Sequence, residues 1–245
     1  MGVVHSEEKL GPVPSVFLWD ADSDTSTQDL ADAYKLGLGR ESIETASKED
    51  KINHGLIEGH QIGKYVAIDC EMVGIGPGGY ESALARVSLV DFHGKQIYDS
   101  YVKPQEKVTD WRTAVSGISP KEMKFARDFT EVQRQVSAIM ENRILVAHDI
   151  HHDLDALKLK HPARDIRDTV MHLEFRTYAD GRKPSLRVLA SNVLGVVIQN
   201  GAHSSIEDAR ITMFIFRKHK AEFDARHALR YGARHNKTKS KKKKK

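Results

Sequence analysis

An α/β fold with a mixed central sheet flanked by helices is the architecture that this sequence of 245 residues predicts. Three runs with strand-like alternation follow one another between residues 65 and 104, as in a meander. Further along, helical patterns alternate with short apolar runs that suit buried strands. Such an order of elements is typical of a layered α/β domain, and roughly 170 residues are enough for one domain.

The strands of the meander are the first expected elements. They are YVAIDCEMVG (65–74), ALARVSLVDF (83–92) and QIYDSYVKP (96–104), and the turn-rich GIGPGGYE follows the first of them. We expect the folded domain to begin near Gly63, because sustained alternation is absent before it.

Helices and strands alternate in the second half of the chain. Thr130 is the expected N-cap of the helix at 129–141, because threonine is a favoured capping residue. Gly195 is expected just after the end of the helix that begins at Pro184. The expected elements in chain order are helices at 119–126 and 129–141, a strand at 143–148, a helix at 151–160, a strand then a turn at 166–173, and helices at 184–195 and 203–230.

Charge divides the chain into three parts. Residues 1–60 carry five Lys and Arg but twelve Asp and Glu, so we expect a mostly disordered acidic extension with a short helix near residues 30–36. Within it, VFLW (16–19) is a candidate docking element, or a patch on the surface of the domain itself. The domain is expected at 61–225, and a Lys-rich basic tail at 226–245.

The composition also bounds the environment of the protein. No run approaches the ~18 apolar residues of a membrane helix, and the first residues lack the apolar stretch of a signal peptide, so no membrane association is expected. A single cysteine, Cys70, rules out an internal disulfide and suits a reducing compartment.

Two carboxylates interrupt the first strand. Asp69 and Glu71 are two residues apart, so in a strand they point to the same side, about 7 Å from each other. Both faces of a sheet between helices are buried, where unpaired carboxylates are costly and two of them repel. A cation between them would remove that cost; a strand end that reaches water is the alternative.

Two further acids lie at the starts of expected helices. Asp153 follows the strand at 143–148, and Asp208 lies in HSSIEDAR (203–210). Each has a structural alternative, because helix N-termini stabilise anions. For Asp208 that alternative is a capping box with Ser205, although Ser204 and Glu207 form an equally good box that leaves Asp208 free to face inward.

The four acids together predict a metal site. Oxygen ligands suit a hard cation such as Mg²⁺ or Mn²⁺. Two such ions about 3.5–4 Å apart are used in phosphodiester cleavage. No cysteine lies near His148, His151, His152 and His161 in the sequence, and the carboxylates form a better site, so we do not expect zinc.

Three motifs carry a resemblance to a known family. DCEMVG, AHDIHHDL and HSSIEDAR resemble the three exonuclease motifs of the DEDDh (DnaQ-like) 3′→5′ exonucleases, which have a ribonuclease-H-like fold. ESALARVSLVD, YVKPQEKVTDWRTAVSGISP, RDT and KPSLRVLA resemble the eukaryotic RNA exonucleases related to the interferon-induced twenty-kilodalton exonuclease, most of all the RNA exonuclease four subfamily. The resemblance spans residues 63–225.

The resemblance implies roles for single residues. The family's metal ligands fall on Asp69, Glu71, Asp153 and Asp208, and its general base falls on His203, since an imidazole that titrates near neutrality suits that task. It implies a 3′→5′ exoribonuclease that uses two Mg²⁺ ions, with Mn²⁺ as a substitute, and releases 5′-mononucleotides from single-stranded 3′ ends. It also implies a nucleolar protein that acts on ribosomal RNA precursors.

Substrate contacts are less sharply defined. The candidates are Met72 as an apolar wedge, Arg86, Arg112 beside Trp111, His148 and Lys183. Their structural alternatives are a core methionine, an Arg86–Glu81 pair and a packed tryptophan. The role of Asp149, where close relatives have a small residue, stays open.

Two other functions are consistent with the sequence. One is an RNA-binding assembly factor of pre-ribosomes whose catalysis is dispensable; the other is a DNA 3′→5′ exonuclease. The five lysines at the C-terminus suit nuclear import and an electrostatic grip on RNA, or simply a solubilising tail.

Overall fold

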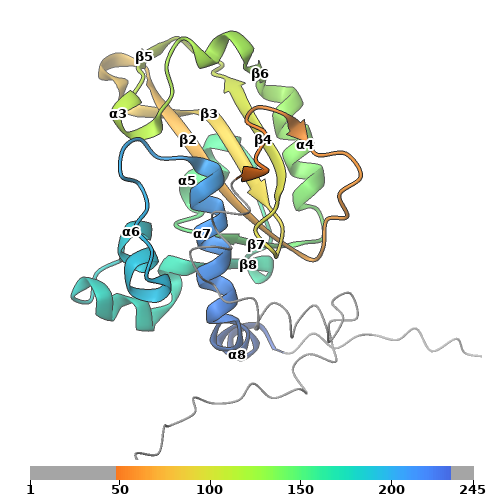
Figure 1. The fold of residues 1–245 in the computed structure, drawn as a ribbon, viewed down its shortest axis with the longest axis vertical. Coiled ribbons are helices and arrows are strands. Elements are labelled where there is room, and N and C mark those ends of the chain that lie inside the picture. The colour runs from red at the N-terminus through yellow and green to blue at the C-terminus, as the bar shows by residue number, and fades with distance from the viewer. Residues whose placement is uncertain (1–47, 233–245) are drawn as a thin grey trace, which may run out of the picture.

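The computed structural model describes residues 48–232 and places a central sheet between two layers of helices (Figure 1). The expectations for the acidic extension up to residue 47, for VFLW (16–19), for a helix near residues 30–36 and for the lysines after residue 232 lie outside the described residues. Within residues 48–232, no helix is long and apolar enough to cross a membrane.

The strands carry the labels of Figure 1. They are β1 (Gly55–Leu56), β2 (Tyr65–Ile75), β3 (Glu81–Val90), β4 (Gln96–Lys103), β5 (Val108–Asp110), β6 (Arg127–Asp128), β7 (Ile144–Ala147) and β8 (Ile166–Asp168).

The helices of four residues or more are α3 (Thr113–Ser116), η3 (Glu122–Phe125), α4 (Phe129–Met140), α5 (His151–Leu157), η6 (Leu173–Ala179), α6 (Leu186–Leu189), the π-helical η7 (Ala190–Leu194), α7 (Ser205–Lys218) and α8 (Lys220–Tyr231). Single 3₁₀ turns are η2 (Pro77–Gly79), η4 (Ala163–Asp165) and η5 (Thr169–Met171).

The sheet is mixed, as the sequence predicts. Its order is β1-β4-β3-β2-β7-β8, with β5 paired to β2 and β6 to β4. The predicted meander β2-β3-β4 is antiparallel, whereas β7 runs parallel to β2 and β8 parallel to β7. The connection from β7 to the parallel edge strand β8 runs through α5.

Side-chain alternation along β2 divides the core into two parts. Val66 and Ile68 pack in one cluster together with α4 and α5. Tyr65 and Ala67 pack in the other, under α6, α7 and α8. In Figure 1, α7 crosses the sheet on the side toward the viewer. By the same alternation, Asp69 and Glu71 lie on the side of α7.

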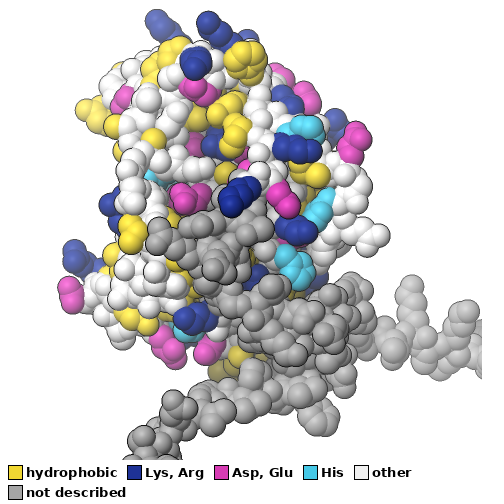
Figure 2. All heavy atoms as spheres, viewed as in Figure 1, with side chains coloured by type: hydrophobic (Ala, Val, Ile, Leu, Met, Phe, Trp, Pro, Cys, Tyr) yellow, Lys and Arg dark blue, Asp and Glu magenta, His cyan; other side chains and the backbone are white. Residues whose placement is uncertain are grey.

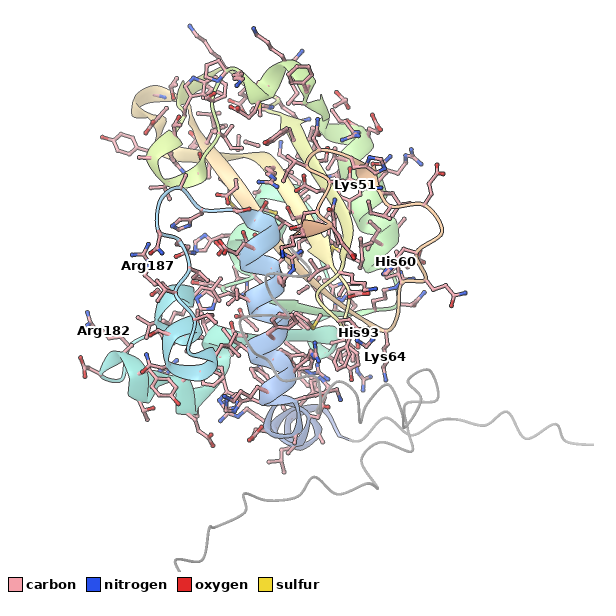
Figure 3. The ribbon with its side chains drawn as sticks, in the orientation of Figure 1. Lys51, His60, Lys64, His93, Arg182 and Arg187 are labelled. Atoms are coloured by element: carbon pink, nitrogen blue, oxygen red, sulfur yellow. The ribbon has the colours of Figure 1, made fainter. Side chains whose placement is uncertain are left out.

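The folded part begins before the residue expected from the sequence. Asn53 donates its backbone N–H to Asp99 Oδ2 at 2.6 Å, and the Asp50 carboxylate lies 2.6 Å from Arg210 Nη2. Lys51, labelled in Figure 3, exchanges two hydrogen bonds with the Gln96 side chain. A segment without strand alternation is therefore held on the sheet by polar contacts with distant residues.

Several helix ends differ from the sequence-based expectations, and the structure shows the contacts behind two of these differences. Asp128, not Thr130, caps α4, because its Oδ1 accepts the backbone N–H of Thr130 at 2.8 Å. The expected final helix is two helices, α7 and α8, which meet at His219, whose φ is −115° and ψ is 19°. The imidazole of His219 packs edge-on against Phe175, a tertiary contact that the helical pattern does not contain.

Surface charge is mixed over the described part of the chain. On the face shown in Figure 2, acidic and basic side chains are interspersed rather than gathered into one field. This distribution agrees with the nearly balanced charge of the middle part of the sequence.

Candidate active site

Three carboxylates from two elements converge at one point. Asp69 and Glu71 come from β2, and Asp208 comes from the first turn of α7. Each of the three carboxylates has one oxygen that lies within 4.8 Å of an oxygen of the other two. Glu71 and Asp208 are buried and Asp69 is half-buried, so the cluster sits at the floor of a hollow rather than on the open surface.

The register of the sheet places a positive charge beside this cluster. Arg86 on β3 is the cross-strand partner of Glu71, and a shift of register follows between Glu71 and Met72. Arg86 is itself buried and its Nε donates to Asp99 Oδ1 at 2.9 Å. Burial raises the pKa of Glu71 and of Asp69, and the Arg86 guanidinium counteracts part of that rise.

Polar contacts under the start of α7 bring Asp208 to the strand. The hydroxyls of Ser205 and Ser88 are 2.7 Å apart, and Ser88 Oγ donates to Asp99 Oδ1 at 2.6 Å. The backbone N–H of Ser205 donates to Glu71. Neither expected capping box forms, because Ser204 occupies the N-cap position without a side-chain cap bond and Ser205 is engaged with the sheet.

The fourth predicted ligand stands slightly apart. Asp153 is buried on the first turn of α5, the helix that packs on the other face of β2. It accepts hydrogen bonds from the thiol and the backbone of Cys70, and its charge raises the pKa of Asp69. Asp153 therefore flanks the cluster of three from the opposite side of the strand.

The electrostatics of the four acids favour a cation as their ligand. Burial is the main cause that raises the pKa of Glu71 and of Asp153 to about 8 and that of Asp208 to about 7. Burial and then the charges of the neighbouring carboxylates also raise the pKa of Asp69. Glu71 Oε1 and Asp208 Oδ1 are buried and have no hydrogen-bond partner among the described residues. A hard divalent cation fits such orphaned oxygens.

His203 lies at the rim of the same cluster. Its Nδ1 is 3.8 Å from Asp208 Oδ2, and about a third of its side chain is exposed. Burial and then the charge of Arg187 lower its pKa, which favours the neutral imidazole. The backbone N–H of His203 donates to the Val115 carbonyl at 2.7 Å, so the loop before α7 is fastened to α3.

A pocket of about 630 Å³ opens over these residues. Glu71, Met72, Arg112 and His203 line it, which brings two of the predicted substrate contacts to the candidate base. Arg112 donates to Ser82 Oγ and to the Gly79 carbonyl at 2.8 Å each, and so it braces one wall of the pocket.

The other predicted substrate contacts have protein partners. Arg86 pairs with Asp99 and not with Glu81. His148 Nδ1 hydrogen-bonds Thr169 Oγ1 at 2.7 Å, and burial lowers the pKa of His148 to about 4. Lys183 Nζ lies 3.0 Å from Asp149, which has a φ of 62°. None of these three side chains lines the pocket of about 630 Å³.

The structure adds three residues to which the sequence analysis assigned no role. Gln199 Nε2 donates to Asp208 Oδ2 at 2.8 Å, and Arg187, labelled in Figure 3, donates to the Gln199 carbonyl. Asp168 accepts the backbone N–H groups of Asp149 and Ile150 just before α5. No local pattern marks Gln199, whereas RDT (167–169) was part of the resemblance without an assigned role.

A buried carboxylate cluster beside a histidine, on a mixed sheet flanked by helices, is the arrangement of a nuclease site. Comparisons with known proteins agree, since residues 66–216 match the model of the RNase_T family, described as "Exonuclease". The chain is 62% identical over 255 residues to RNA exonuclease 4 of Gibberella zeae, covering 99% of this chain and 80% of that protein. It is 45% identical to RNA exonuclease 4 of Saccharomyces cerevisiae, covering 91% and 73%.

Solved structures share the fold. The catalytic unit of Neurospora crassa Pan2, with its protease and nuclease domain, superposes with a TM-score of 0.60 at 25% identity over 74% of this chain and 31% of that chain. The Saccharomyces cerevisiae Pan2 module in complex with AAUUAA RNA gives 0.58 at 27% identity over 74% and 34%. The chain thus belongs to the DEDDh exonuclease family, in its RNA exonuclease 4 subfamily.

Proposed function

We propose that the protein is a metal-dependent 3′→5′ exoribonuclease that releases 5′-mononucleotides from single-stranded RNA. One observation carries the proposal: oxygens of Asp69, Glu71 and Asp208 lie within 4.8 Å of one another at a pocket that His203 also lines. The name of the relatives, RNA exonuclease 4, and the RNA bound in the Pan2 structure support RNA as the substrate.

The four acids are the proposed ligands of the metal. Asp69, Glu71 and Asp208 would hold a divalent cation between them, and Asp153 would contribute to a second one beside Asp69. When bound, such cations lower the pKa of a water molecule and neutralise charge at the scissile phosphate. We propose Mg²⁺ as the ion, with Mn²⁺ as a substitute, because all the ligand atoms are oxygens.

The remaining side chains serve the proton and the substrate. The neutral imidazole of His203 accepts the proton of the attacking water, and its position at the rim leaves it in contact with solvent, to which it returns that proton. Met72 offers an apolar surface to the terminal base in the pocket, and Arg112 braces the part of the wall near Gly79.

The biological setting is part of the same proposal. The subfamily points to trimming of ribosomal RNA precursors in the nucleolus, with pre-ribosomal proteins as partners of the acidic N-terminal residues. The seven lysines among the last ten residues suit both nuclear import and RNA binding.

Degradation of an RNA strand tests the proposed activity. A 5′-labelled single-stranded RNA and the DNA of the same sequence are incubated with the purified protein in Mg²⁺ or in EDTA, next to the Asp69→Asn variant. We expect a Mg²⁺-dependent ladder that shortens from the 3′ end and is absent for the variant. An intact RNA that both proteins bind equally would favour the assembly-factor function instead, and faster loss of the DNA would favour a DNA exonuclease.

A further inference from the structure

A second pocket, of about 270 Å³, lies between α8 and the segment from β8 to η5. Three consecutive residues relate it to the active site. His151 lines this second pocket, His152 lines the pocket of about 630 Å³, and Asp153 is a candidate metal ligand. The first turn of α5 therefore separates two neighbouring hollows, only one of which the proposed activity uses.

The wall of the second pocket is largely apolar and aromatic. Ile150, Ile166, Met171, Phe223 and Tyr231 contribute to it. Met171 is about half exposed, although it borders the pocket. Such a wall suits a flat ring more than a hydrated ion, because stacking on aromatic and apolar side chains is favourable for any planar base.

A buried histidine at this pocket lacks polar partners. His172 is 1% exposed and stacks on Phe175 with ring centroids 4.4 Å apart. Neither Nδ1 nor Nε2 has a hydrogen-bond partner among the described residues. Burial lowers the pKa of His172, so the ring is neutral and presents one N–H donor and one acceptor. Such a pair is rarely left unsatisfied without a ligand or water.

Cations gather around the mouth of the pocket. Arg226 and Arg230, one helical turn apart on α8, both line it, and like charges at that spacing repel unless an anion lies between them. Arg226 uses Nη1 for the Met171 carbonyl, and the guanidinium of Arg230 lies 5.3 Å from the Tyr231 ring. Arg167 also lines the pocket and is 3.5 Å from Asp224.

One acid lines the pocket as well, but its oxygens are already engaged. Asp168 accepts the backbone N–H groups of Asp149 and Val170 at Oδ1 and that of Ile150 at Oδ2. The histidines at the rim, His151 and His227, add no negative charge. The pocket thus offers an apolar interior and a cationic mouth, which matches a planar ring that carries an anionic group.

We propose that this pocket binds one nucleotide unit, with the base against Phe223 and Tyr231 and the phosphate between Arg226 and Arg230. Its volume of about 270 Å³ lies near the lower end of the ~300–1,000 Å³ of ligand pockets, which limits the ligand to a single unit. The active site lies across α5, whose residues His151 and His152 line the two pockets. The nucleotide unit can belong to a bound RNA strand or be a released mononucleotide, since both carry a base and a phosphate. That it belongs to an RNA strand rests on the proposed function.

Strand binding in EDTA tests the pocket without turnover. The anisotropy of a labelled RNA of about 12 nucleotides is measured with wild type, with Arg226→Gln/Arg230→Gln and with Ala163→Trp, which narrows the mouth without a change of charge. The control is Lys124→Gln/Arg134→Gln, an equal loss of charge at exposed positions on η3 and α4. We expect both pocket variants to bind about ten-fold more weakly and the control to change less than about two-fold.

Two further arms distinguish the sources. If the unit belongs to an RNA strand, the pocket variants lose the kcat/KM advantage of the long strand over one of about four nucleotides, while activity on the short strand is kept. If it is a released product, 5′-AMP or 5′-UMP binds wild type and not the pocket variants, and the length advantage stays. Because the binding arm needs no activity, an inactive protein would refute the proposed function alone.

Either of two results would overturn the nucleotide pocket. Equal affinities of the pocket variants and the control for RNA and for both mononucleotides would show that general charge is responsible. A labelled peptide of residues 13–30 that binds wild type but not Arg226→Gln/Arg230→Gln, with RNA and mononucleotide binding unchanged, would assign the pocket to the acidic segment instead.

Discussion

The Asp208 side chain shows at the scale of one residue how the site is prepared. Gln199 donates to Oδ2, and the His203 imidazole lies 3.8 Å from the same oxygen. Oδ1 is buried and has no partner among the described residues. Protein groups therefore fix one oxygen, while the other is free to bind a metal ion; hydrogen bonds to a carboxylate orient it as a metal ligand in this way.

Replacement of His203 tests the proposed base. We expect His203→Ala to lower kcat by about 10²–10⁴, as for a lost acid–base group, while the KM for RNA changes little. The matched control is His152→Ala, which removes another imidazole from the lining of the same pocket without a contact to Asp208. Steady-state kinetics on a labelled RNA measure both variants, and equal losses for the two would contradict the role of His203.

Short elements between long ones carry much of the geometry of the site. The turn before α5 contains Asp149 with a φ of 62°, a value that non-glycine residues adopt at a cost. Asp168 on β8 holds this turn by accepting the N–H groups of Asp149 and Ile150, and Asp153 follows within the next turn of helix. The position of Asp153 thus depends on a neighbouring strand.

Weakening of this contact gives the next prediction. Asp168→Asn keeps the shape of the side chain but replaces one acceptor oxygen by an NH₂ donor, which then faces a backbone N–H group, such as that of Ile150. We expect the free energy of unfolding to fall by about 1–3 kcal/mol, as measured by urea unfolding. Asp155→Asn, at an exposed position of α5, serves as the control and should change it by less than about 0.5 kcal/mol.

That loss of stability has a functional counterpart. Because Asp153 follows the turn, we expect Asp168→Asn to need a higher Mg²⁺ concentration for half-maximal activity, whereas the Asp155→Asn control keeps the wild-type value. A destabilised variant with an unchanged Mg²⁺ dependence would show that Asp168 supports only the fold.

The elements also show what the sequence can and cannot predict. Alternation over eight or more residues is sufficient to predict β2, β3 and β4 from the sequence. The apolar run before His148 is sufficient to predict β7. β1 and β5 have only two and three residues, too few for a periodic pattern, and they form because a neighbouring strand offers an open edge. The break at His219 depends on Phe175, which is more than forty positions away in the chain.

The same distinction holds for the site. The spacing of Asp69 and Glu71 fixes their common side by the pleat of the strand, so their approach was predictable. The contact of Ser205 with Ser88 joins positions 117 residues apart, and the pairing of Arg86 with Asp99 depends on the register of β3 and β4. Such partners follow from the packed sheet, which local patterns do not describe.

At the scale of the whole molecule, the acidic cluster ties stability to pH. The folded-state pKa values of Glu71 and Asp153 are about 8 and that of Asp208 about 7, all above their unfolded values near 4. Between those limits the folded state binds more protons than the unfolded state. The free energy of unfolding of the metal-free protein therefore falls as the pH rises from about 4 to 8 through these groups.

Thermal unfolding measures this linkage. We expect the gain in Tm on addition of Mg²⁺ to be larger at pH 8 than at pH 5.5, because a bound cation favours the ionised carboxylates whose charge is destabilising at the higher pH. Asp208→Asn, which removes one of these groups, should reduce the difference between the two gains. Equal gains at both pH values in wild type would show that Mg²⁺ binds elsewhere.

Direct titration of the metal tests the central claim, that the carboxylates at β2 and α7 hold divalent cations. Mn²⁺ binding is followed at pH 7.5 by the loss of the free-ion signal in electron paramagnetic resonance, for wild type, Asp208→Asn and the control Asp155→Asn. We expect wild type and the control to bind two Mn²⁺ ions. We expect Asp208→Asn to bind Mn²⁺ at least about ten-fold more weakly, which is the lower end of the ~10–100-fold losses of affinity seen when metal sites are altered. Unchanged Mn²⁺ binding by folded Asp208→Asn would contradict the account.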